Sequence, residues 1–181
     1  PPDQADGVEN WGCAAFGGYA CLVWNTTGNG QNSGYAHIVS AAEDSTVVIQ
    51  RLNATDNPRG TLRTIALSDR FLILGIETGN SALDLARFIP ASDETVTNVA
   101  QDLFSGGTIT VYAAARVAGS SDFVVICQVG ANLITRRFTN VGVLQLEYSS
   151  IVATATAVCI EASSTANQVN IGYVVAGDAF W

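Results

Sequence analysis

Hydrophobic and polar residues alternate with a period of two along much of this chain, the pattern of β-strands that bury one face. Within residues 108–117, Ile109 and Val111 point to one side and Tyr112 to the other. Residues 123–129 are apolar almost throughout, as expected of a strand covered on both faces. The strands predicted from these patterns are 14–24, 34–40, 46–52, 61–67, 71–76, 108–117, 123–129, 143–148, 151–160 and 168–175.

Two segments depart from this alternation and are predicted to be short helices that connect the sheets. Residues 80–88 open with an asparagine suited to a helix N-cap and contain good helix formers, and Pro90 ends them. A second helix is predicted over about 94–104, with Ser92 or Asp93 as its cap and a glycine pair after it.

Nine or ten strands joined by two short helices predict an all-β protein built as one β-sandwich domain over residues 1–181. The jelly roll is favoured among sandwiches because it commonly carries helical insertions between its strands. Residues 1–10 are predicted to form an N-terminal arm, and residues 176–181 a C-terminal tail.

Composition and charge exclude several classes of function. Of 181 residues, 48% are hydrophobic and 13% are charged, which is too apolar for a disordered chain. Sixteen acidic residues against eight basic ones give a net charge of −8. Such a surface repels phosphate groups, so we expect no direct nucleic-acid partner and no anionic membrane partner. Because no apolar run is long enough for a spanning helix, no transmembrane segment is expected either.

Four cysteines leave the redox compartment open. Cys13 and Cys21 lie eight residues apart in a glycine-rich segment, a spacing that allows a disulfide bond across a local hairpin. Cys127 and Cys159 each fall in a predicted strand. Four buried free thiols are the alternative, and no pair has the spacing of a zinc site.

Catalysis has little support in the sequence, and we expect that the protein is not an enzyme. His37 is the only histidine and no serine lies in a GxSxG elbow, so a catalytic triad lacks its parts. Carboxylates such as Glu147 and Glu161 are present, but a working pair would have to come from different strands. Calcium held by loop oxygens is the one metal that the composition allows, and no calcium or nucleotide motif occurs; we therefore assign no catalytic, metal or cofactor site.

Aromatic residues near the start of the chain offer a second class of function. Trp11, Tyr19 and Trp24 would form a glycan-binding platform if they lay exposed on one face. That arrangement would make the protein a carbohydrate-binding module or a lectin-like domain of a secreted protein. In a sandwich, such residues more often fill the core or an interface.

The favoured interpretation is a structural subunit that assembles with copies of itself. An apolar β domain with few charges and with extensions at both ends suits a virion shell or decoration protein, by analogy at the level of the fold alone. The location would be a virion or the extracellular space, and other structural proteins are possible partners. An extracellular filament is a third interpretation. The predicted assembly contacts are Asp3, Asp6, Trp11, Phe180 and Trp181.

Overall fold

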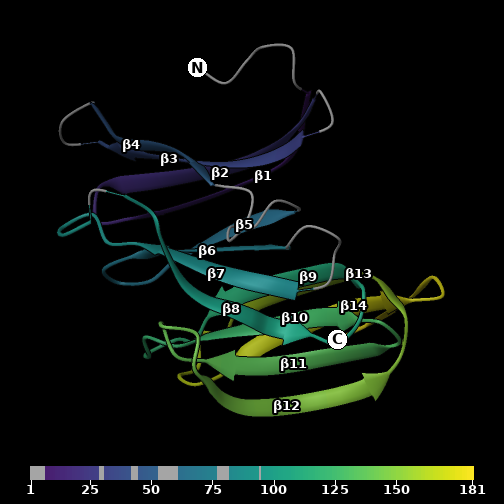
Figure 1. Cartoon of the computed structure of the whole chain (residues 1–181). Helices are drawn as coiled ribbons and strands as arrows, with labels where there is room; N and C mark the ends of the chain where they lie inside the picture. The colour runs from purple at the N-terminus through teal and green to yellow at the C-terminus, as the bar shows by residue number, and fades with distance from the viewer. Residues whose placement is uncertain (1–6, 29–30, 42–44, 53–60, 77–81, 94) are drawn as a thin grey trace. The chain divides into compact units, whose positions relative to one another are not determined.

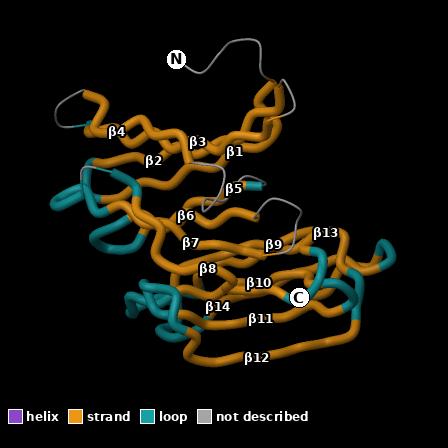
Figure 2. The backbone as a smooth tube through the Cα atoms, in the orientation of Figure 1, coloured by secondary structure: helices purple, strands orange, loops and turns teal. Residues whose placement is uncertain are grey.

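The chain is all-β, as the alternation predicted. The computed structural model describes residues 7–28, 31–41, 45–52, 61–76, 82–93 and 95–181, and these form fifteen strands with no helix among them (Figure 1; Figure 2). Every strand pair whose register is described is antiparallel. The contacts group the chain into two compact units, one of residues 1–78 and 83–101 and one of residues 79–82 and 102–181.

The strands belong to four sheets, and in each sheet they stand in chain order. The first sheet contains β1 (Gly7–Phe16), β2 (Tyr19–Gly28), β3 (Gln31–Ser40) and β4 (Ser45–Leu52). The second contains β5 (Leu62–Ala66), β6 (Phe71–Ile76), β7 (Ala82–Phe88) and β8 (Thr97–Ser105). The third contains β9 (Ile109–Arg116), β10 (Phe123–Val129), β11 (Asn132–Phe138) and β12 (Leu144–Val152). The fourth contains β13 (Ala155–Ala162), β14 (Val169–Val175) and β15 (Asp178–Phe180).

This order differs from the predicted jelly roll. Consecutive strands are hydrogen-bonded neighbours in every sheet, which makes each sheet a meander, whereas a jelly roll is built from two Greek keys. Short turns explain the meander: Gly17 and Gly18, both at positive φ (55° and 82°), allow the tight hairpin that joins β1 to β2. The single strand predicted over 14–24 is therefore two strands.

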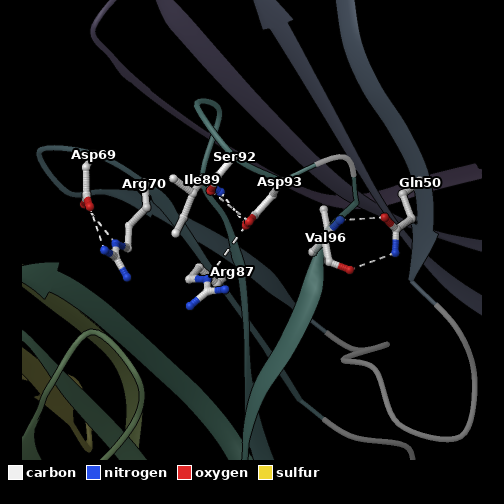
Figure 3. A network of polar contacts seen from close by, with 8 residues as sticks. All are labelled: Gln50, Asp69, Arg70, Arg87, Ile89, Ser92, Asp93 and Val96. Carbon is white, nitrogen blue, oxygen red and sulfur yellow. Dashed lines mark hydrogen bonds and ion pairs between the residues drawn. The ribbon is translucent and has the colours of Figure 1, made fainter.

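Both predicted helices are wrong. Ala82–Phe88 is strand β7, and Leu83, Leu85 and Ala86 are all fully buried, so both faces of this strand are covered. In the second segment, Thr97–Ser105 is strand β8. The Asp93 carboxylate accepts a hydrogen bond from the backbone N–H of Ile89, at 2.8 Å, and so closes a turn over residues 89–93 instead of capping a helix that follows it (Figure 3).

The predicted terminal extensions are partly strand. Residues 1–6 lie outside the described part of the chain, but Gly7–Phe16 is β1 and pairs with β2. Asp178–Phe180 is β15 and pairs with β14. Residues 7–10 and 178–180 of the predicted extensions therefore belong to sheets.

The core of the first unit lies between its two sheets. Inward-facing side chains of β2 and β3, among them Val23 and Ile38, pack with Phe71 and Ile73 of β6 and with Phe88 of β7. All five are fully buried. In addition, the ring of Phe16 lies 4.6 Å from that of Phe71, centroid to centroid. Val23 and Ile38 lie on one face of the sheet because neighbouring side chains leave a strand on opposite sides.

The core of the second unit lies between the β9–β12 sheet and the β13–β15 sheet. Ile126 of β10 and Leu133 of β11 are buried and pack with Ile160, Ile171 and Tyr173 of the facing sheet. Around this core, two arginines of β11 are held by ion pairs: Arg136 with Glu147 at 2.9 Å and Arg137 with Asp122 at 2.7 Å.

In each unit, a glutamine side chain satisfies backbone groups of a neighbouring segment. The Gln50 Nε2 donates to the Val96 carbonyl at 3.1 Å, and its Oε1 accepts from the Val96 N–H at 2.7 Å (Figure 3). Gln128 is fully buried; its Nε2 donates to the carbonyls of Gly130 (2.8 Å) and Ala153 (2.7 Å), and its Oε1 accepts from the Ala155 N–H at 2.9 Å. Each amide thus gives hydrogen-bond partners to backbone groups at or next to the end of a strand.

Replacing Gln128 with leucine should destabilise the second unit, because one donor and two acceptors of the backbone lose their partner in a low-polarity site. At about 1 to 3 kcal/mol for each buried group left unsatisfied, with some recovered by hydration, we expect a loss of roughly 2 to 4 kcal/mol in the free energy of unfolding. Urea titration monitored by circular dichroism measures this loss. The matched control is Gln145→Leu on exposed β12, and equal stabilities of the two variants would contradict the role of Gln128.

Candidate assembly surfaces

The β1–β4 sheet carries apolar side chains on both of its faces. One face packs into the core of the first unit, and the register shows which residues point the other way. Across the four strands, Cys13 stands opposite Leu22, Leu22 opposite His37, and His37 opposite Ile49. We call this side the outer face, and it carries the side chains of Trp11, Cys13, Leu22, Trp24, Tyr35, His37 and Ile49.

Large apolar side chains on the outer face are exposed. The exposed fraction is 65% for Trp11, 43% for Leu22 and 57% for Ile49. The exposed side of a two-layer sandwich is normally polar, so this face departs from the usual alternation of apolar inside and polar outside. Contiguous exposed apolar surface marks an interaction site.

The aromatic residues of the outer face form one row across three strands. Trp24 lies between Trp11 and Tyr35 in the register, and its ring stacks on that of Tyr35 with centroids 5.4 Å apart and planes 12° apart. Trp24 is only 9% exposed, so Trp11 is the aromatic side chain of the row that offers most surface to a partner.

Tyr19, the third residue of the predicted glycan platform, lies on the other side of the sheet. It packs against the core cluster of the first unit, with its ring 6.3 Å from that of Phe16. The structure therefore brings Trp11 and Trp24 together and separates Tyr19 from them.

The predicted partner cysteines also lie on opposite faces. Cys13 pairs in register with Leu22, and Cys21 with Ala14, so Cys13 is on the exposed outer face while Cys21 is buried in the core. Both are free thiols, and side chains that leave a sheet on opposite sides are not placed for a disulfide bond. The structure thus does not support the Cys13–Cys21 bridge.

The four cysteines divide into two kinds. Cys13 and Cys159 are exposed, whereas Cys21 and Cys127 are buried. Burial raises the pKa of the Cys21 thiol to about 12 and that of the Cys127 thiol to about 12, because a thiolate would lose its hydration. At neutral pH, only the exposed pair is therefore open to thiol reagents.

A second exposed apolar element is β12, an edge strand of its sheet. Leu144, Leu146 and Tyr148 are 50%, 50% and 45% exposed. Its pairing with β11 is interrupted twice by register shifts, a feature that bends an edge strand and limits unwanted pairing. The charge of Glu147 on this strand is compensated by Arg136, whose guanidinium also lies over the Phe104 ring at 4.8 Å.

The predicted contacts at the other end of the chain lie on the β13–β15 sheet. Phe180 is 45% exposed and stacks on Tyr173, with ring centroids 5.1 Å apart. Trp181 is 92% exposed, and the edge of its indole lies over Gly172 and beside Cys159. A Cβ at Gly172 would come within 2.7 Å of this ring, so glycine is what allows the indole to lie against the sheet. Asp3 and Asp6 lie outside the described residues.

Side chains that could carry chemistry are scattered. The Nε2 of His37 lies 3.1 Å from the Thr46 hydroxyl, and none of the hydrogen bonds described for His37 involves a carboxylate. Within the described ranges, no three histidine, cysteine, aspartate or glutamate side chains gather to hold a metal ion, and no helix is long and apolar enough to cross a membrane.

Models of known protein families give no match to the chain, and no curated protein is similar to it.

Leu22, Tyr35 and Ile49 are the outer-face residues that the sequence analysis missed. The signal was present in two places: Ala20 to Trp24 is apolar at five consecutive positions, and Val47 to Ile49 at three. In a strand, consecutive apolar positions mean that both faces are apolar.

Proposed function

We propose that the protein is a structural subunit that assembles with copies of itself, as a shell or decoration protein of a virion, and that the outer face of β1–β4 is an interface between copies. The exposure of Trp11, Leu22 and Ile49 on a sheet whose other face already fills a core is the observation that carries this proposal. The proposal does not require a jelly roll, because a meander sandwich can tile a surface equally well.

The size of the outer face sets what it can do. Four strands about 4.8 Å apart, each contributing about eight residues at about 3.3 Å, span roughly 500 Å². Two such faces bury about 1,000 Å² in total, which is at the lower limit for a specific interface. One face therefore supports a weak pairwise contact, and a stable assembly needs several contacts per subunit. The exposed side chains of β12, Phe180 and Trp181 are the candidates for the others.

Charge favours an interface at this face over one elsewhere. The chain carries a net charge of −8, so copies repel one another at a distance. None of the outer-face side chains named above is a carboxylate, a lysine or an arginine. Contact through this face therefore brings little charge into apposition, and added salt should strengthen association by screening the remaining repulsion.

Glycan binding is the alternative, and the 65% exposure of Trp11 is the observation that favours it. A platform needs ring faces that lie open to the sugar. Trp24 is covered by its stack with Tyr35, and Tyr19 lies on the other side of the sheet, so the predicted three-residue platform is reduced to one open ring.

Leu22→Glu should weaken association, because it places a charge in the middle of the outer face. The carboxylate would have to be desolvated between two copies, and we expect at least a tenfold rise in the dissociation constant, measured by light scattering over a range of concentrations. Val141→Glu is the matched control: Val141 is 41% exposed against 43% for Leu22, but it lies in the turn before β12. Equal association by Leu22→Glu and the unmodified chain would refute the interface.

Trp11→Ala distinguishes the two functions when it is tested on a glycan array. If the protein binds glycans, some glycan on the array is bound by the unmodified chain and lost on substitution. We expect no glycan that behaves in this way, and we expect weaker self-association of the variant. A glycan bound at micromolar affinity through Trp11 would favour the lectin-like alternative over assembly.

A further inference from the structure

A cavity of about 310 Å³ opens between the two sheets of the second unit. It continues the core at one end of the sandwich, where Val117 and Val124 come from the β9–β12 side and Val169 and Ile171 from β14. Tyr148 of the edge strand β12 also lines it. These four lining side chains are aliphatic, and Tyr148 adds an aromatic ring at the sheet edge.

The rim of this cavity is held by hydrogen bonds within the protein. Two turns, 117–122 and 163–168, meet where the Asn167 N–H donates to the Ala118 carbonyl at 3.1 Å. The first turn is closed by the Val117 N–H, which donates to the Asp122 carbonyl at 2.9 Å. The second is closed by the Ser163 N–H, which donates to the Gln168 carbonyl at 3.2 Å. Such a rim makes the opening a preformed feature.

Polar groups are placed at the edge of the cavity. Arg137 donates to the Asp122 carboxylate, with Nε 2.9 Å from Oδ2. Tyr148, which lines the cavity, carries a hydroxyl group that can both donate and accept a hydrogen bond. The side-chain amides of Asn167 and Gln168, which also line the cavity, add further donors and acceptors.

We infer that this cavity binds a small, uncharged and mostly apolar molecule that carries one hydroxyl or carbonyl group. A cavity of about 150 Å³ accommodates benzene, so roughly twice that volume accommodates a two-ring aromatic or a compact aliphatic of similar size. The volume is also at the lower end of the range of natural ligand sites. A neutral ligand follows because no charged side chain is among the described residues that line the cavity, and the nearby Arg137 is neutralised by Asp122.

Binding is tested with 2-naphthol as the probe and the full chain as the protein. Calorimetry should give a dissociation constant below about 1 mM, and 2-naphthoate, which carries a charge on the same rings, should bind at least tenfold more weakly. In amide NMR spectra, the probe should shift the signals of Val117, Val124, Val169 and Ile171. Shifts confined to other parts of the chain, or no binding at the solubility limit of the probe, would overturn the inference and indicate a cavity that holds only water.

Val169→Phe fills the cavity and should weaken binding of 2-naphthol at least tenfold. Val143→Phe is the control for added bulk, because Val143 is 56% exposed and is not a lining residue. Tyr148→Phe keeps the ring and removes the hydroxyl, so it should reduce the affinity for 2-naphthol several-fold. Unchanged affinity in a folded Val169→Phe protein would refute the site; if that variant does not fold, the NMR shifts of the unmodified chain decide.

Discussion

Apolar sheet faces must be covered, and this constraint governs both units of the protein. In the first unit, Val23 and Ile38 of one sheet meet Phe71 and Ile73 of the other, which covers one face of β1–β4. The opposite face of that sheet is apolar as well and has Leu22 among its exposed side chains. Each Å² of apolar surface that stays in water forgoes about 25 cal/mol of stabilising free energy. A second copy is the simplest means of covering this face.

Covering a face also requires that every buried backbone group keeps a partner, and the two glutamines meet this need. Gln50 binds both polar backbone groups of Val96, and Gln128 binds three groups that lie at the joint between the sheets of the second unit. The side chains at the surface include paired ions, such as Arg137 with Asp122, and the exposed apolar side chains of the outer face and of β12.

Local burial patterns made much of the fold predictable, and long-range pairing made the rest unpredictable. The all-β class followed from the alternation, and the apolar run 123–129 coincides with β10. Strand β11 was missed because Arg136 and Arg137 stand side by side in it, and only the folded protein shows that each has its own acidic partner. The predicted jelly roll is not confirmed, because strand order depends on turns such as that at Gly17. Trp11 was predicted as a contact residue without any indication of the face on which it lies, and the structure shows that its side chain is exposed.

The rate at which a thiol reagent modifies Cys13 tests the central claim most directly. In a Cys159→Ser variant, Cys13 on the outer face is the one exposed cysteine, because Cys21 and Cys127 are buried with raised pKa values and do not interfere at neutral pH. If copies associate through this face, Cys13 should react at least tenfold more slowly in concentrated, assembled protein than in dilute protein. Equal rates in assembled and dissociated protein would show that the outer face of β1–β4 is not an interface.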